Sequence, residues 1–309
     1  MKQRLVISLG GNAFARDGED MTMLGQFEFA ASTLAPLSQL FGSEHQILLT
    51  HGNGPQVGYI LTRVEEALGK AYALPLEVCV AESEGEIGYV LQQTVHNLTA
   101  GQRPVTTLLT QVVVDAADPA FAAPTKPIGP WFEPAHADAL AQAGMSLVRD
   151  DANRGRRVVA SPHPVRVVET PVIEKMLELG VIVIAAGGGG IPVVEQDDRL
   201  AGVEAVIDKD LATAMLAASI GADQLVLVTG VAGVYEDFGS DQARLLERSC
   251  ARELEALAAA GHFPAGTMGP KVEAALQFVA ATGKPAVICQ PSELAAAING
   301  TAGTRVEAQ

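Results

Sequence analysis

Three lysines of this chain stand where phosphate chemistry would need them. Lys209 lies between Asp208 and Asp210, at the point where an apolar run gives way to a helical pattern. Lys126 lies in a Pro-Thr-Lys-Pro sequence, and Lys271 follows a Gly-Pro pair at the start of another helical pattern. Because fixed ammonium groups beside glycine-rich turns gather phosphate charges, these settings together indicate a phosphoryl-transfer site.

The position of two of these lysines at helix starts supports the same interpretation. A lysine at a helix N-terminus faces the positive end of the helix dipole, which is unfavourable by itself. Flanking carboxylates relieve this conflict at Lys209, and a bound phosphate would do so as well. The simpler alternative is that Asp208 is a helix N-cap beside a surface lysine. Since Lys271 repeats the arrangement, we favour the phosphate site.

The overall charge makes the lysines more informative. The chain has 309 residues, a formal net charge of -15 and only seven lysines, so an anionic ligand needs a local cluster of cations. The same field repels nucleic acid and anionic membranes, and we expect neither as a partner. No uninterrupted apolar stretch approaches the roughly 18 residues that a membrane span requires.

The cysteines indicate a reducing environment. Cys79, Cys250 and Cys289 are odd in number and show no CxxC spacing, which predicts neither a disulfide framework nor a zinc site. No other metal site of the protein itself is predicted. The apolar run at residues 5–9 is too short for the core of a signal peptide. We therefore expect a cytoplasmic protein.

Alternating strand and helix patterns must position the lysines. Hydrophobic residues make up 48% of the chain but aromatic residues only 5%, a composition typical of an α/β protein with an aliphatic core. Glycine-rich turns follow the apolar runs at 5–9, 46–50, 181–186 and 224–228. Ligands of open parallel sheets collect beyond the carboxyl ends of the strands, so these turns should meet at one edge. His51, in the second turn, is either a ligand or base or a cap of the turn, and we favour the cap.

Two further segments have a distinct character. Residues 118–164 are rich in proline, contain the only tryptophan and carry a basic run, which predicts an inserted subdomain or lid that bears Lys126. A predicted helix over 75–97 carries four glutamates, namely Glu77, Glu82, Glu84 and Glu86. We interpret these glutamates as a solvated acidic face in preference to a metal site.

Six segments of the chain together resemble the carbamate kinases, a branch of the amino acid kinase family. They are residues 9–13, 50–58, 124–130, 187–192, 202–210 and 266–273. Each segment is a weak signal alone, but the six occur in the family's order over nearly the whole chain. The stretch Pro-Thr-Lys-Pro-Ile-Gly-Pro at 124–130 is particular to carbamate kinases.

The resemblance implies the architecture. It is a single α/β domain over residues 1–309, a three-layer αβα sandwich with an open, mainly parallel central sheet and a small protruding subdomain. Residues 1–180 would form the acceptor-binding lobe, with the protruding insert at about 118–164, and residues 181–309 the nucleotide-binding lobe. Carbamate kinases form homodimers, so the resemblance implies a homodimer as well.

The resemblance also implies the activity, a reversible phosphoryl transfer between ATP and carbamate with Mg²⁺ accompanying ATP or ADP. In reverse, carbamoyl phosphate and ADP give ATP and carbamate, which breaks down to ammonia and CO₂, a step of arginine metabolism. Carbamate is already an anion at its nucleophilic oxygen, so no general base is required. The obstacle is the repulsion between two anions, which a lysine clamp would overcome.

The site residues implied by motif position fall into three groups. Lys126, Lys209 and Lys271 would be catalytic, with Asp208 orienting the lysines. The acceptor would be bound by Gly10, Gly11, Asn12, Gly52 and Asn53. The nucleotide would be bound by Tyr235, Met268, Gly269 and Asp210, the last as a helix cap or near the metal.

Three departures from the family pattern leave alternatives open. Gly230 and Ala232 stand where acidic or amide residues are usual, which concerns nucleotide affinity. Glu84 stands where a neutral amide is usual, which concerns substrate preference or an interface. The alternatives are an amino acid kinase-family enzyme acting on another small carboxylate-like acceptor, and a non-catalytic sensor of nucleotide or carbamoyl phosphate.

Overall fold

An eight-stranded sheet forms the centre of the protein in the computed structural model, which describes residues 2–10, 22–142, 144–263 and 267–308. Across the sheet the strands are β15 (Arg248–Cys250), β17 (Thr304–Glu307), β16 (Ala286–Cys289), β12 (Gln224–Val228), β1 (Arg4–Leu9), β2 (Gln46–His51), β9 (Ile182–Ile184) and β3 (Val105–Thr107). Only the β16–β17 pair is antiparallel among them. The predicted open, mainly parallel sheet is confirmed.

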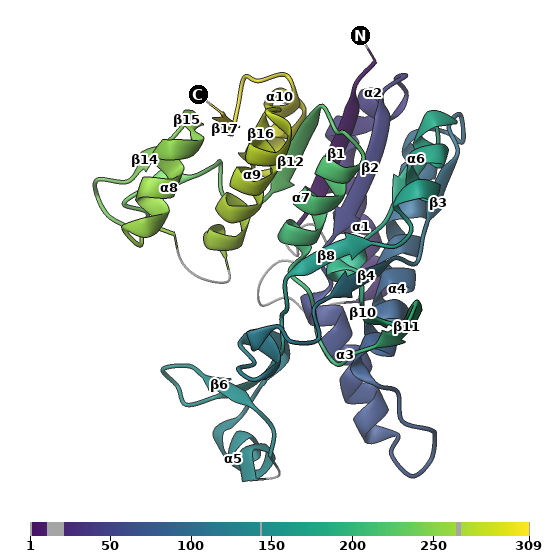
Figure 1. Cartoon of the computed structure of the whole chain (residues 1–309), viewed down its shortest axis with the longest axis vertical. Coiled ribbons are helices and arrows are strands. Elements are labelled where there is room, and N and C mark those ends of the chain that lie inside the picture. Colours follow the sequence, from purple (N-terminus) through teal and green to yellow (C-terminus); the bar gives the residue numbers. More distant parts are fainter. Residues whose placement is uncertain (1, 11–21, 143, 264–266, 309) are drawn as a thin grey trace.

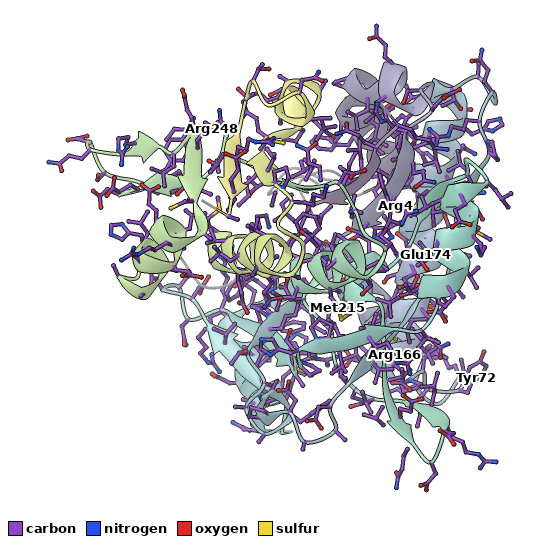
Figure 2. The ribbon with its side chains drawn as sticks, turned by 45° about the horizontal axis from the view of Figure 1, so that its top comes forward. Arg4, Tyr72, Arg166, Glu174, Met215 and Arg248 are labelled. Carbon is purple, nitrogen blue, oxygen red and sulfur yellow. The ribbon has the colours of Figure 1, made fainter. Side chains whose placement is uncertain are left out.

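Helices cover both faces of this sheet and complete three layers (Figure 1). One face is covered by α6 (Thr170–Glu178), α7 (Lys209–Ser219), α8 (Ala251–Ala259) and α9 (Met268–Thr282). The other face is covered by α1 (Met23–Leu34), α2 (Ser38–Phe41), α4 (Leu76–Leu98) and α10 (Leu294–Ile298). Figure 2 places Arg248 of β15 toward one end of the sheet and Glu174 of α6 toward the other.

Alternation along the strands explains the two cores. Successive side chains of a strand point to opposite faces, so Val6 and Leu48 pack under α7 while Ile7 and Leu49 pack under α1 and α4. Both faces are covered, and the strands are therefore apolar almost throughout, as buried parallel strands are. In β1 and β2 this pattern is broken on the α7 face by two buried hydroxyl residues, Ser8 and Thr50.

A smaller subdomain projects from the sandwich, as predicted for the insert. It consists of a three-stranded antiparallel sheet with one helix, built from β5 (Lys126–Phe132), α5 (Pro134–Gln142), β6 (Leu147–Arg149) and β7 (Gly155–Val159). Figure 1 shows β6 and α5 at the lower left, away from the main sheet. A second sheet at the base of the insert has the order β11 (Arg199–Gly202), β10 (Ile191–Gln196), β4 (Gln111–Val114) and β8 (Pro164–Val167).

The insert is held against α3 (Gly54–Glu66) by very close backbone packing. A Cβ atom placed on Gly58 would lie 1.9 Å from the Cα of Gly129 in β5. Ile128 is buried in a cluster with Val57, and Arg157 forms an ion pair with Glu65. The strand that carries Lys126 is therefore positioned by contact with α3.

We expect Gly58→Ala to displace β5 and Lys126 with it. The added methyl group has no space, because its neighbour is backbone, and such overpacking costs about 1–3 kcal/mol. Turnover should fall together with the melting temperature. Gly85→Ala is the matched control, since Gly85 is also helical but a Cβ there would meet no atom within 4 Å. Equal melting temperatures for both variants would contradict this account of the insert.

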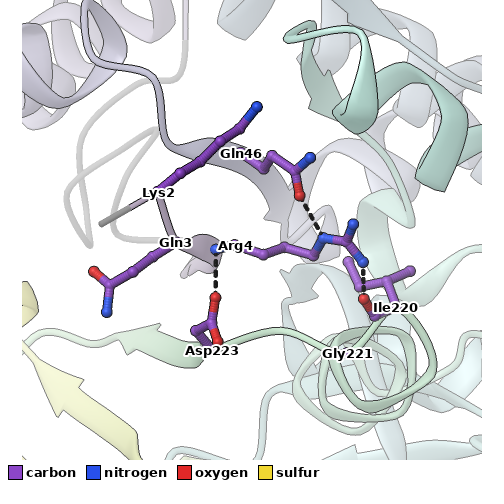
Figure 3. A pocket seen from close by; sticks show the side chains of 7 residues that line it. All are labelled: Lys2, Gln3, Arg4, Gln46, Ile220, Gly221 and Asp223. Atoms are coloured by element: carbon purple, nitrogen blue, oxygen red, sulfur yellow. Dashed lines mark hydrogen bonds between the residues drawn. The ribbon is translucent and has the colours of Figure 1, made fainter.

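The carboxyl end of α7 is fixed at the opposite edge of the sheet (Figure 3). The Arg4 guanidinium donates to the carbonyl oxygen of Ile220 and, at 2.7 Å, to Oε1 of Gln46. The backbone N–H of Arg4 donates to Oδ2 of Asp223 at 2.8 Å. A cation at the end of a helix complements the negative end of its dipole. These bonds tie α7 to β1 and β2 at the end remote from Lys209.

Candidate active site

The glycine-rich turns meet at one edge of the sheet, as predicted. Gly10 follows β1, Gly52 follows β2 and residues 187–190 follow β9, and these strands are neighbours. A Cβ on Gly188 would lie 2.0 Å from Nδ2 of Asn53, so the four-glycine turn packs directly on the loop after β2. The N-terminus of α7 lies beside the same turn, because a Cβ on Gly189 would lie 2.5 Å from the carbonyl oxygen of Ile207.

All three lysines converge on the two aspartates that flank Lys209. Lys209 forms an ion pair with Oδ1 of Asp210, and Nζ of Lys271 lies 2.9 Å from Oδ2 of the same carboxylate. Nζ of Lys126 reaches from the insert to within 2.9 Å of Oδ2 of Asp208. Asp210 and its two lysine partners are almost fully buried. The arrangement leaves one positive charge in excess at the edge where the turns meet.

The roles of the two aspartates differ only in part from those expected, because Asp208 does contact a lysine, Lys126, as expected. Asp208, not Asp210, is the N-cap of α7, because its Oδ1 accepts the backbone N–H of Asp210 at 2.9 Å. Asp210 is the residue that holds two lysines together. The helical geometry explains why Asp208 is the cap, since a side chain at the cap position points back over the first turn, whereas one at the second helical position can turn toward β1 and α9.

Electrostatics keeps the aspartates charged. Burial opposes ionisation of Asp210, but Lys209 and Lys271 outweigh it and hold the pKa of this carboxyl below its usual value. Asp208 behaves similarly, since burial is outweighed mainly by Lys126 and its pKa is lowered. Burial lowers the pKa of Lys209, against the attraction of Asp210 and with the repulsion of Lys271. A bound phosphate would stabilise the charged form of this lysine.

The other predicted site residues take varied positions. Asn53 is buried and its Nδ2 donates to Oγ of Ser83 at 2.9 Å, while Gly11 and Asn12 lie outside the described residues. Tyr235 lies in the short hairpin of β13 (Tyr235–Glu236) and β14 (Arg244–Leu245), where its ring contacts Phe238. Met268 and Gly269 form the first turn of α9. None of the polar or ring contacts in the described part of the chain joins Tyr235 to the lysines.

Comparisons with known proteins identify the family of this chain. The sequence profile of the amino acid kinase family matches residues 3–290. This chain belongs to the amino acid kinase family. Among its relatives, the carbamate kinase of Pyrococcus horikoshii is 42% identical over 312 residues, 99% of each chain. The carbamate kinase-like protein YahI of Escherichia coli is 44% identical over 314 residues, again 99% of each chain.

Solved structures of the family have the same fold. The structure of carbamate kinase from Giardia lamblia bound to AMP-PNP has a TM-score of 0.91 and 38% identity, and covers 99% of this chain and 98% of that one. An N-acetylglutamate synthase from Neisseria gonorrhoeae has a TM-score of 0.57 at 16% identity, which shows the fold alone. The αβα sandwich with its protruding subdomain is thus an amino acid kinase fold, and the chain is a kinase.

One glutamate of this amino acid kinase was wrongly predicted to be solvated. Glu84 is 1% exposed, and its Oε2 accepts the backbone N–H of Thr110 at 2.8 Å. It lies on the same stripe of α4 as Val80, Ile87 and Leu91, which faces the sheet because of the helical period. Burial raises the pKa of Glu84 well above its usual value, which favours the protonated, neutral form of this carboxyl group. A neutral acid can replace an amide there, and the buried side chain forms no interface.

Glu84 also helps to hold the four-glycine turn. Oγ1 of Thr110 accepts the N–H of Ala186 at 2.9 Å, and its carbonyl oxygen accepts the N–H of Ile191 at 2.8 Å. Thr110 therefore clamps both ends of the turn, and Glu84 fixes Thr110. Ala186 needs this support, since its φ of 50° is unfavourable for a residue with a side chain.

His51 is a buried neutral residue, which favours the interpretation as a turn residue over that as a base. It is 1% exposed, and its Nδ1 lies 3.2 Å from the carbonyl oxygen of Gly52. Burial lowers the pKa of His51 to about 4, with a further contribution from the charge of Lys209. A histidine that stays neutral throughout the physiological range adds no charge to the site.

We expect His51 to make the protein less stable in acid. The unfolded chain binds a proton at this residue below about pH 6.5, whereas the folded protein does so only below about pH 4. The free energy of unfolding should therefore fall by about 3 kcal/mol between these pH values through His51 alone. In urea unfolding across this pH range, the free energy of unfolding should fall less steeply for His51→Gln than for wild type. Thr94→Val, a change at a buried residue that does not titrate, is the control and should keep the wild-type slope. An unchanged slope for His51→Gln would contradict the neutral buried state.

Two further observations bear on ligands and partners. No group of three or more histidine, cysteine, aspartate or glutamate side chains within the described ranges is arranged to hold a metal ion. Of the helices that the structure describes, none is long and apolar enough to cross a membrane.

Proposed function

We propose that this amino acid kinase is a carbamate kinase, which transfers a phosphoryl group reversibly between ATP and carbamate. The observation that carries the proposal is the convergence of Lys126, Lys209 and Lys271 on two neighbouring aspartates at the edge where the glycine turns meet. Relatives that match this chain over nearly their whole length, such as the 42% identical protein of Pyrococcus horikoshii, are named carbamate kinases.

The chemistry suits a site without a general base. In the direction of ATP formation, a β-phosphate oxygen of ADP attacks the phosphorus of carbamoyl phosphate, and the bond from phosphorus to the carbamate oxygen breaks. Carbamate leaves as an anion and decomposes to ammonia and CO₂. No proton is transferred in the phosphoryl step, so the protein needs only to align the reactants and support the charge of the transferring group. Buried ammonium groups supply that support.

Each lysine has a distinct place in this scheme. Lys209 and Lys271 share one carboxylate and would contact the transferring phosphoryl group and the nucleotide phosphates. Lys126 pairs with Asp208, and phosphate oxygens would compete with that carboxylate for its ammonium group. Because Lys126 belongs to the insert, it would close over the reactants from the side opposite Lys209 and Lys271.

The acceptor and the nucleotide would occupy opposite sides of the lysines. Backbone N–H groups at Gly10, Gly11 and Gly52, with the amides of Asn12 and Asn53, would hold the carbamoyl group. Nδ2 of Asn53 donates one of its two hydrogens to Ser83, and the second can be donated to an anion. The nucleotide would lie along Asp210, Tyr235, Met268 and Gly269. We propose residues 1–180 as the acceptor lobe, with the insert at about 118–164, and 181–309 as the nucleotide lobe.

Mg²⁺ would enter with the nucleotide. The oxygen atoms of Asp208 and Asp210 are used by lysines and a helix N-terminus, so they form no dedicated cage for a cation. This fits an ion that keeps several waters and binds mainly through substrate phosphates. When bound, it would neutralise charge on those phosphates. The residues present would hold the metal–nucleotide complex through the lysines and the first turn of α9.

We further propose a cytoplasmic homodimer that acts in arginine metabolism. The three cysteines are free thiols, which fits a reducing compartment. The edge strand β3 and the adjacent helix α4 offer a surface for a second copy, since Tyr89 is 55% exposed and Val78 is 36% exposed there. Sedimentation of wild type and Tyr89→Glu tests the assembly, and a dimer that persists in the variant would place the interface elsewhere.

The decisive experiment is a coupled assay of ATP formation from ADP. We expect turnover with carbamoyl phosphate and much slower turnover with acetyl phosphate. Turnover of another acyl phosphate alone would identify a kinase for a different small acceptor. ADP binding by calorimetry without any turnover would identify a sensor, a function whose only support is the replacement of polar residues by Gly230 and Ala232. The comparisons favour neither alternative.

A further inference from the structure

Two buried hydroxyl groups lie next to each other beneath the N-terminus of α7. Ser8 of β1 and Thr50 of β2 are partners in the parallel register of these strands, and neither side chain is exposed. The inward residues two positions earlier, Val6 and Leu48, are apolar and belong to the core under α7. A polar pair at the end of two otherwise apolar strands costs stability unless its hydrogen bonds are satisfied.

The hydroxyl group of Ser8 is bonded within the lysine–aspartate cluster. Nζ of Lys209 donates to Oγ of Ser8 at 3.0 Å, and Oγ of Ser8 lies 3.2 Å from Oδ1 of Asp210, to which it donates. Since Lys209 also pairs with this carboxylate oxygen, the three groups form a closed ring. An ammonium group has three N–H donors, so the ring fixes two and leaves one for a phosphate oxygen.

Thr50 acts on the backbone of the same lysine. Its Oγ1 lies 2.7 Å from Oγ1 of Thr213 in α7. The hydroxyl of Thr213 donates to the carbonyl oxygen of Lys209 at 2.6 Å. A hydroxyl has a single hydrogen, so Thr213 must accept from Thr50, and the chain of bonds runs from β2 through Thr213 to Lys209. Both the carbonyl group and the ammonium group of Lys209 are thus attached to the sheet.

These strands also carry the turns proposed to hold the acceptor. Ser8 stands two residues before Gly10, and Thr50 stands two residues before Gly52. We propose that Ser8 and Thr50 are positioning residues for phosphoryl transfer, which fix Lys209 relative to the loops that bind the acceptor. The proposal rests on the proposed function. It predicts an effect on the rate of transfer, because positioning matters most where charge develops.

Ser8→Ala and Thr50→Val, which remove the hydroxyls, test the proposal in the carbamoyl phosphate assay. Ser8→Ala removes hydrogen bonds to charged groups. Its kcat should therefore fall by about tenfold or more, while both KM values change by less than about twofold. Thr50→Val should lower kcat by roughly threefold, because its bonds are between neutral groups. Thr50→Ser keeps the hydroxyl and should restore wild-type kcat. Thr94→Val is the matched control, a buried threonine whose Oγ1 has no hydrogen-bond partner within the described part of the chain.

The outcomes separate this proposal from the proposed function. A kcat for Ser8→Ala within twofold of wild type would overturn it, as would an equal loss in Thr94→Val. If wild type forms no ATP from carbamoyl phosphate, the proposed function fails first. Crystal structures of wild type and Ser8→Ala then decide the positioning role. The proposal expects Nζ of Lys209 to move away from Asp210 or to occupy several rotamers in the variant, and an unchanged, ordered Lys209 would contradict it.

Discussion

Lys209→Ala and Lys271→Ala should each reduce the turnover of carbamoyl phosphate by about a hundredfold or more. Each variant removes a buried ammonium group from the place where negative charge gathers in the transition state, a loss of about 3 kcal/mol of stabilisation. The fold should survive, because Asp210 keeps one lysine partner in either variant. Steady-state kinetics with a far-ultraviolet circular dichroism spectrum would measure both properties.

Lys175→Ala is the control for the two lysine variants. Lys175 is 75% exposed and pairs with Glu178 on the surface of α6, so its removal should leave turnover unchanged. The double variant of Lys209 and Lys271 should lose less than the product of the single losses, since both lysines share one carboxylate. Near-normal rates in both single variants would show that the cluster is an ion-pair network of the core without a catalytic role.

Asp210→Ala should have the largest effect on stability of any single substitution in the site. The carboxylate is 4% exposed and holds Lys209 and Lys271, so its removal leaves two neighbouring buried cations without a counter-charge. Breaking a buried ion pair in this way costs about 3–5 kcal/mol. Turnover should fall by at least about a hundredfold as well, because both lysines lose their fixed positions. Urea unfolding and the coupled assay would measure the two losses.

The lowered pKa of Asp210 determines how its contribution to stability depends on pH. The pKa of Asp210 is lower in the folded protein than in the unfolded chain, so its contribution to stability is complete above about pH 4 and is lost as the pH falls through the folded-state pKa. The stability difference between wild type and Asp210→Asn should therefore shrink in acid. Asp138→Ala, which breaks an exposed pair with Arg149, should cost less than about 1 kcal/mol at any pH. A pH-independent difference for Asp210→Asn would contradict the charge-based account.

Those features of the protein that depend on local patterns could be predicted from the amino-acid sequence. Apolar runs predicted the central strands, since strands buried on both faces need continuous hydrophobicity. Glycine-rich turns after those runs predicted the edge where the site forms, and the proline-rich composition of 118–164 predicted the protruding insert. The unusual settings of Lys126, Lys209 and Lys271 are visible in the sequence alone, because scarce lysines beside glycine, proline or aspartate contrast with an acidic chain.

The contacts between these features could not be predicted in this way, because they join segments that are far apart in the sequence. Lys126 pairs with a residue 82 positions away, and Ser8 is bonded to one 201 positions away, so no local pattern contains either contact. The strand order brings β1 beside β12 and β2, and the register then places Ser8 and Thr50 side by side under α7. The burial of Glu84 depends in the same way on which stripe of α4 faces the sheet. Side-chain partners depend on packing between distant segments, and packing is a property of the whole folded chain.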